Sequence, residues 1–168
     1  MLVNIIDISG SYLKTKEFSV YAVLSNVLKW NIQQVSVDLR VGKLFAIGKT
    51  KLVDTDAGKV PPHKEVKLPH ILKPGEYAIA QTIEEIHQGK RKYACLLQPR
   101  SRAFRIGLSI QTNLWGPAYE GPITFGIANL SPNPVNISRG TSLVQLAFID
   151  IKGEVIQVTH TFQRGRVL

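Results

Sequence analysis

Apolar and polar residues alternate along several short segments of this chain, and this alternation restricts the fold more than any other feature. In segment 35–41, four aliphatic residues alternate with a serine, an aspartate and an arginine, and segment 123–127 has the same period. A period of two places successive side chains on opposite faces of a β-strand, so both segments are predicted to be half-buried strands. Further strands are expected at 18–23, 76–83, 93–98, 107–112, 143–150 and 154–160.

Turns rich in glycine and proline separate these segments, as at Lys73-Pro74-Gly75 and at 131–134. Helical turns are expected only near 22–29 and 101–105, and segment 52–70 is expected to be a long loop. Many short strands with regular turns predict an all-β fold, either a barrel or a jelly roll. The length of 168 residues fits a single domain, 1–168.

A formal net charge of +9 favours anionic partners, but the basic residues are spread along the chain. Their one triplet, Lys90-Arg91-Lys92, is interpreted as a solvated turn, and nucleic acid is an unlikely partner because no nucleic-acid motif frames it. No apolar stretch approaches the ~18 residues that a membrane span needs, so a cytoplasmic protein without a membrane partner is expected. The single cysteine, Cys95, excludes an internal disulfide and is expected to be a buried thiol.

Three arginines and a serine hydroxyl gather in the segment Pro99-Arg100-Ser101-Arg102-Ala103-Phe104-Arg105. Guanidinium groups and hydroxyls are strong donors to phosphate oxygens. This cluster therefore predicts a phosphate-binding site, with a nucleotide as the natural ligand.

The same segment resembles the phosphate motif of the dCTP deaminase and dUTPase family, Arg-Ser-Ser-x-x-x-x-Gly-Leu. Segment 34–42 resembles the first motif of the deaminase branch, and 72–84 resembles its Pro-Gly-Glu strand. With Leu143-Val144-Gln145-Leu146, four motifs follow in the order of the family, over about residues 31–151. The resemblance implies a distorted jelly roll, or β-clip barrel of the dUTPase-like type, that assembles as a homotrimer with sites between subunits.

The resemblance also assigns the phosphate contacts. They are Arg100, Ser101, Arg102, Gln145, Arg164 and Arg166. Arg102 departs from the family, which usually has a second serine there. Arg164 and Arg166 belong to a basic tail, 161–168, which is either a flexible arm that closes over the triphosphate or a simple disordered end.

The base and the deoxyribose are expected to lie in the hairpin between Leu108 and Gly121. The pocket residues implied by the resemblance are Leu114, Trp115, Gly116, Ala118 and Tyr119. Tyr119 would lie against the sugar, where its ring leaves no space for a 2′-hydroxyl.

Catalysis is where the chain departs most from the family. Both positions at which the family has a proton-handling carboxylate are glycines, Gly116 and Gly126. Glycine cannot activate water or transfer a proton. The remaining candidate catalytic residues are Arg105, which matches an arginine of the deaminase branch, and Glu120, the nearest acid.

Two functions follow from this resemblance. The first is a hydrolase acting on dCTP or dUTP, with Mg²⁺ carried by the triphosphate and with no metal bound by the protein. The second is a catalytically impaired relative that only binds a deoxynucleotide or a protein partner. Zinc-dependent deamination is excluded, because it needs Pro-Cys-x-x-Cys and the chain has one cysteine.

Overall fold

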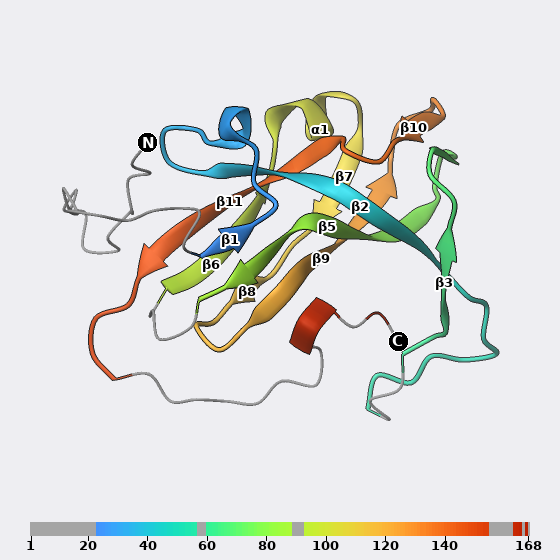
Figure 1. The fold of residues 1–168 in the computed structure, drawn as a ribbon. Helices are drawn as coiled ribbons and strands as arrows, with labels where there is room; N and C mark the ends of the chain where they lie inside the picture. The colour runs from blue at the N-terminus through green and yellow to red at the C-terminus, as the bar shows by residue number, and fades with distance from the viewer. Residues whose placement is uncertain (1–22, 57–59, 89–92, 155–162, 166, 168) are drawn as a thin grey trace.

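A computed structural model describes residues 23–56, 60–88, 93–154, 163–165 and 167 (Figure 1). The strands are β1 (Leu24–Ser25), β2 (Val37–Ile47), β3 (His63–Val66), β4 (His70–Leu72), β5 (Tyr77–His87), β6 (Tyr93–Pro99), β7 (Leu108–Gln111), β8 (Leu114–Trp115), β9 (Glu120–Asn129), β10 (Val135–Ile137) and β11 (Ser142–Asp150). The helical elements are η2 (Lys29–Asn31), α1 (Ser101–Arg105) and η3 (Gln163–Gly165). The predicted all-β architecture with very little helix is confirmed. Among the described residues, no helix is long and apolar enough to cross a membrane.

One curled sheet forms most of the molecule, with the strand order β7-β9-β5-β2-β11-β6-β8 (Figure 1). Strand β1 pairs with β5 and β3 pairs with β2, while β10 and β4 form a separate pair. The long strand β2 serves both halves of the sheet. Its first residues pair with β11, and from Val41 onward it pairs with β5, with a register shift between Val41 and Lys43. Its last four residues also pair with β3.

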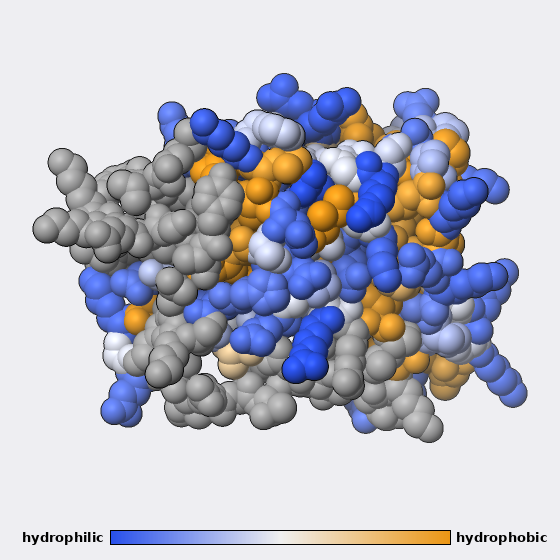
Figure 2. Space-filling view, in the orientation of Figure 1, coloured by the Kyte–Doolittle hydropathy of each residue, from blue (hydrophilic) through white to orange (hydrophobic). Residues whose placement is uncertain are grey.

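The alternation of side chains explains how the sheet encloses the core. The inward-facing residues of β9 are Ile123, Phe125 and Ile127, which are almost fully buried. In β5 the residues at even positions are buried and those at odd positions lie on the outer face. The outer surface is mixed, with hydrophilic side chains over the middle of the face shown in Figure 2 and apolar patches on either side.

The polar residues at the start of β2 are more buried than expected for a strand with one face in contact with solvent. Asp38 is only 4% exposed, and Ser36, just before the strand, is equally buried. The alternation predicted the apolar face correctly, but these polar side chains have protein partners in place of water. Strand β2 is thus buried on both faces only at its start, Val37–Leu39, where Asp38 contacts Arg100 and Gln33, whereas Lys43 and Ile47 farther along are exposed.

A buried ion pair joins the two central strands. The carboxylate of Glu84 on β5 is fully buried and accepts hydrogen bonds from the backbone N and the Nε of Arg40 on β2, at 2.7 and 2.6 Å. Nη2 of Arg40 also donates to the backbone O of Asn26, at 2.6 Å. The pair lies where β5 departs from regular pairing between Gln81 and Glu85, so it stabilises the irregular part of the sheet.

Two local expectations are only partly right. A helical turn was expected near 22–29, and η2 begins at Lys29, but Leu24 and Ser25 form β1 because they pair with Ile86 and Glu85 of β5. The expected loop 52–70 contains β3, which pairs with β2. In both cases pairing with a distant strand decides the conformation. Most of the strands expected at 18–23 and 154–160, and the triplet at 90–92, lie outside the described residues.

Candidate functional site

A pocket of about 450 Å³ opens beside the start of α1, between this helix, β2 and β11. The residues that line it are Gln33, Gln34, Val35, Ser36, Asp38, Arg100, Ser101 and Gln145. Three of the residues predicted to contact phosphate, Arg100, Ser101 and Gln145, therefore come together from two separate parts of the chain. We call this the Arg100 pocket.

The position of Arg100 is fixed by its backbone and by its guanidinium group. Its backbone N donates to the O of Leu143 at 2.9 Å, which attaches the start of α1 to β11. Its Nη2 lies 3.2 Å from Oδ2 of Asp38. The side chain of Arg100 remains 39% exposed, so the guanidinium group is held in place and is still accessible from solvent.

Asp38 is the buried acid of the Arg100 pocket. Burial raises the pKa of its carboxyl group, while Arg100 and a hydrogen bond from Gln33 act in the opposite direction. Nε2 of Gln33 lies 3.3 Å from Oδ2 of Asp38. The paired cation thus helps to keep Asp38 charged in a position where burial alone would favour the neutral acid.

Gln145 lies opposite Asp38 in the pairing of β11 with β2. Its Oε1 accepts a hydrogen bond from the Oγ of Ser36 at 3.0 Å, which leaves the amide Nε2 as the donor side of the group. Arg100, Ser101 and Gln145 together offer a cation, a hydroxyl and an amide to a ligand. This set of donors suits phosphate oxygens.

The sequence did not assign Gln33 or Ser36 to a site, and it offered Asp38 only as the carboxylate to consider if the hairpin is wrongly assigned, although all three line the Arg100 pocket. A signal was present, because Ser36 and Asp38 belong to the segment 34–42 that resembles a family motif. Their alternation with aliphatic residues made them look like the solvated face of a strand.

Helix α1 separates the arginines of the predicted phosphate cluster. Arg102 and Arg105 do not line the Arg100 pocket, but lie in a groove of about 750 Å³ with Phe104 and the residues 131–136. Gly107 fixes one wall of this groove. It has a φ of +82°, and a Cβ there would lie 2.5 Å from the Cβ of Ser131, so the turn after α1 requires glycine.

The hairpin predicted to hold the base has a buried inner side and an open outer side. Trp115 and Tyr119 are buried, with ring centroids 6.1 Å apart in an edge-to-face arrangement. The Tyr119 hydroxyl donates to the backbone O of Pro122, and burial raises the pKa of Tyr119 to about 12. Gly116 is open, because no atom lies within 4 Å of the position of a Cβ there.

Leu114 and Ala118, the other two predicted base contacts, are exposed. None of the five residues predicted to contact the base or the sugar lines the Arg100 pocket. The structure therefore keeps the predicted phosphate and base contacts of one chain apart.

The end of the chain packs against this hairpin. A Cβ on Gly121 would lie 2.8 Å from the Cα of Arg164, and Nε2 of Gln81 donates to the backbone O of Gly165 at 2.7 Å. Arg164 is exposed and is not among the residues that line the Arg100 pocket. Arg166, also a predicted phosphate contact, lies outside the described residues.

The space above Gly126 is occupied by side chains from the two neighbouring strands. A Cβ on Gly126 would lie 2.2 Å from the Oη of Tyr77 on β5 and 2.8 Å from the Oε1 of Gln111 on β7. No carboxylate is among the three atoms nearest this position. Glu120, the acid predicted to replace the missing carboxylate, is exposed at the start of β9.

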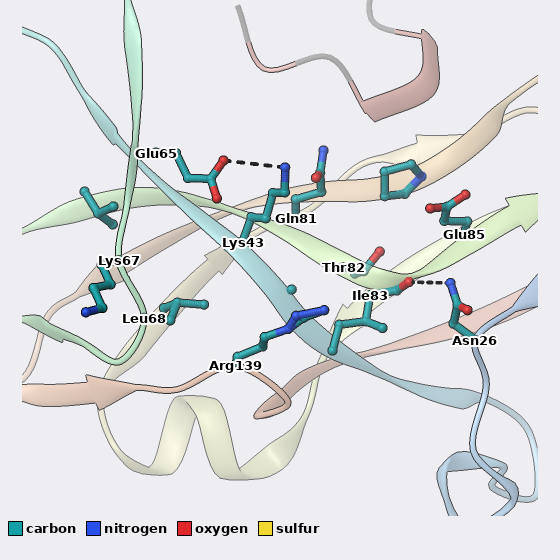
Figure 3. Close-up of a pocket in the computed structure, with 13 residues that line it drawn as sticks. Asn26, Lys43, Glu65, Lys67, Leu68, Gln81, Thr82, Ile83, Glu85 and Arg139 are labelled. Atoms are coloured by element: carbon teal, nitrogen blue, oxygen red, sulfur yellow. Dashed lines mark hydrogen bonds and ion pairs between the residues drawn. The ribbon is translucent and has the colours of Figure 1, made fainter.

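A further cavity, of about 610 Å³, lies around Gly42, and its lining includes Lys43, Glu65 and Arg139 (Figure 3). Nζ of Lys43 lies 3.5 Å from Oε2 of Glu65. None of the residues predicted to bind phosphate or base lines this cavity. Among the described residues there is no group of three or more His, Cys, Asp or Glu side chains that could hold a metal ion.

The chain is similar to known proteins in sequence and in fold. A family model described as dCTP deaminase-like matches residues 12–151. A probable deoxyuridine 5′-triphosphate nucleotidohydrolase of Methanothermobacter thermautotrophicus is 29% identical over 124 residues, covering 73% of this chain and 81% of the relative. A dCTP deaminase of Pyrobaculum calidifontis is 30% identical over 140 residues, covering 80% of this chain and 79% of the relative.

Among solved structures, the 2′-deoxycytidine 5′-triphosphate deaminase of Agrobacterium tumefaciens matches with a TM-score of 0.57 and 18% sequence identity. The match covers 74% of this chain and 43% of that chain, so the present chain spans less than half of that protein. At this identity the match shows a shared fold.

Proposed function

Because the chain belongs to the dCTP deaminase-like family, we propose that it binds a deoxypyrimidine nucleoside triphosphate and hydrolyses it slowly. The observation that carries this proposal is the Arg100 pocket, in which a cation, a hydroxyl and an amide converge beside a buried acid. The reaction is either deamination, in which dCTP and water give dUTP and ammonia, or hydrolysis, in which dUTP and water give dUMP and pyrophosphate.

Mg²⁺ enters this proposal as part of the substrate. Of the residues that the structure describes, Asp38 is the single carboxylate that lines the Arg100 pocket. Mg²⁺ is commonly held by one or two carboxylates together with substrate phosphates and water. Asp38 therefore fits an Mg²⁺ ion that arrives with the triphosphate. The positive charge of this ion would offset the repulsion between Asp38 and the phosphates.

Turnover is the weak point of the proposal, because Gly116 and Gly126 replace the carboxylates that the resemblance implies. General acid–base help is worth about 10²–10⁴-fold in rate. We expect Glu120, an exposed acid outside these two positions, to supply only part of this help, so turnover should be slow and should depend on Glu120. The second candidate function, a module that binds the nucleotide without hydrolysing it, is favoured by the way Tyr77 fills the space above Gly126.

The test is to incubate the protein with Mg²⁺ and either dCTP or dUTP, and to measure ammonia and pyrophosphate beside calorimetric binding. We expect binding with slow turnover, and we expect Glu120→Gln to abolish that turnover without weakening binding. Glu65→Gln, on an exposed acid paired with Lys43, is the matched control and should change neither quantity.

The other outcomes of this test are equally informative. Binding without ammonia or pyrophosphate would establish the second candidate function. Fast turnover that Glu120→Gln leaves untouched would mean that the hairpin is wrongly assigned and that another carboxylate, such as Asp38, does the work. Failure to bind either nucleotide would reject both functions.

We further propose that a complete site forms between copies of the chain in a homotrimer. The phosphate and base contacts of one chain line different surfaces, and the groove that holds Arg102 and Arg105 is open to a neighbouring copy. Light scattering should give three times the chain mass of 18.7 kDa. A monomer that binds the nucleotide at full affinity would contradict this proposal.

Complementation tests the shared site more directly. Arg100→Glu removes a phosphate contact, whereas Gly116→Leu blocks the base pocket at a position where a side chain meets no other atom. Each variant alone should lose binding. When equal amounts of the two variants assemble at random, about one quarter of all sites combine two unaltered halves, so binding should return to about that fraction of the sites. No recovery in mixed trimers would place both halves of the site within one chain.

A further inference from the structure

Tyr77, Gly126 and Gln111 lie on three neighbouring strands of the sheet. Tyr77 is on β5, Gly126 is on the middle strand β9, and Gln111 is on β7. Gln111 is paired directly with Gly126, and Ile79 is the partner of Gly126 on the other side. The Oη of Tyr77 lies over the backbone of Gly126, at the place where any other residue would have its Cβ. Since a Cβ would be only 2.2 Å from Oη, glycine is required for the tyrosine to take this position.

The two polar groups over Gly126 are accessible. Tyr77 is 38% exposed, and Gln111 is also exposed. Nε2 of Gln111 donates to the Oγ of Ser109 at 3.0 Å, which directs Oε1 toward Gly126 and Tyr77. The arrangement therefore offers a phenol hydroxyl and an amide oxygen side by side, in an orientation fixed by the strands.

Both groups are electrically neutral. Burial raises the pKa of the Tyr77 phenol above its ordinary value, so the hydroxyl keeps its proton at physiological pH. A neutral donor beside a neutral acceptor suits a neutral ligand edge that itself carries donors and acceptors. It does not suit phosphate, for which the chain has the cationic Arg100 pocket.

We propose that Tyr77 and Gln111 form a neutral hydrogen-bonding pair that recognises the pyrimidine base of the bound nucleotide. This inference rests on the proposed function. The connection is the position of Gln111, which is the last residue of β7 and the first of the segment that leads through β8 to Tyr119. Gln111 is also the direct partner of Gly126, so the segment that forms the hairpin begins beside Gly126 and the pair lies at the entrance to the hairpin.

The experiment measures the affinity of the full chain for dUTP, dCTP and inorganic tripolyphosphate by calorimetry. Tyr77→Phe removes the hydroxyl and should weaken binding of at least one of the two nucleotides by about 3- to 10-fold, as expected for one neutral hydrogen bond. Affinity for tripolyphosphate should not change, since it contacts only the Arg100 pocket. Gln111→Ala should behave in the same way, and Tyr93→Phe, which removes a hydroxyl on β6, should leave all three affinities unchanged.

The possible outcomes distinguish a failure of this inference from a failure of the proposed function. If the unaltered protein binds tripolyphosphate and nucleotides but Tyr77→Phe leaves the nucleotide affinities unchanged, the pair does not read the base. If Tyr77→Phe weakens the binding of all three ligands equally, the substitution disturbs the protein structure as a whole, and the inference is again wrong. If the unaltered protein binds no nucleotide, the proposed function itself fails.

A second variant tests the geometry without a ligand. Gly126→Ala should lower the thermal unfolding midpoint, because the new methyl group would overlap Tyr77. The same substitution in a Tyr77→Ala background should cost much less. An alanine at 126 that is tolerated equally in both backgrounds would show that the tyrosine is not held in place over Gly126.

Discussion

Replacing Arg100 by glutamate is expected to weaken binding of dUTP and dCTP roughly 100-fold, because a hydrogen bond between charged groups is worth about 1.5–3 kcal/mol and each 1.4 kcal/mol is tenfold in affinity. The substitution has a second effect. It places a carboxylate next to Asp38, whose Oδ2 lies 3.2 Å from the guanidinium group of Arg100. The two acids would repel each other and the triphosphate. Calorimetric titration in buffer of fixed ionic strength measures the loss.

Arg139→Glu is the matched control for this experiment. Arg139 is an exposed arginine that lines the cavity around Gly42 and not the Arg100 pocket. The charge change is identical in the two variants, so Arg139→Glu reports the long-range effect of charge alone and should alter affinity by no more than about threefold. Equal nucleotide affinities of Arg100→Glu and Arg139→Glu would show that the phosphates do not bind in the Arg100 pocket. Circular dichroism on both proteins verifies that they are folded.

The second large effect is expected on stability. Glu84→Ala should lower the free energy of unfolding by about 3–5 kcal/mol, since it leaves the Arg40 guanidinium group in a largely buried position without its carboxylate. The backbone N of Arg40 would lose its acceptor as well. For a chain of this length, the loss corresponds to a fall of roughly 6–20 °C in the unfolding midpoint.

Glu65→Ala is the control for the stability measurement. Glu65 pairs with Lys43 at 3.5 Å, and both side chains are about half exposed. Exposed pairs contribute about 0–1 kcal/mol, so this variant should unfold close to the unaltered protein. Replacing both Arg40 and Glu84 by apolar residues should recover part of the loss, because no unpaired charge then remains buried. Similar unfolding midpoints for Glu84→Ala and Glu65→Ala would show that the buried pair is not important for stability.

The period of two was enough to predict most of the long strands, because one face of each strand packs against the core wherever it pairs. It could not predict what the polar residues of β2 contact. Asp38 and Arg40 are separated by one residue on this strand, yet Asp38 meets Arg100 and Arg40 meets Glu84. Those partners come from distant parts of the chain, and alternation contains no information about them.

The candidate site was predictable to a similar extent. The arginine-rich segment and Gln145 were found from their residue types, and the structure places Arg100, Ser101 and Gln145 in one pocket. That Arg102 and Arg105 line a different surface was not predictable, since it depends on the direction that one helical turn takes between β6 and β7. The glycine at 126 was visible in the sequence, but the tyrosine that occupies its space belongs to another strand.

The contact between Tyr77 and Gly126 also restricts the mutational routes that are open to this lineage. A substitution at 126 that adds any side chain meets the tyrosine first, whereas a substitution at 77 that shortens the side chain meets no such obstacle. A carboxylate at 126 would therefore have to displace the Tyr77 side chain, which is partly exposed and meets position 126 only through its far end. Shortening residue 77 first would remove this cost, so the residue at 77 sets how easily a carboxylate can return to the strand.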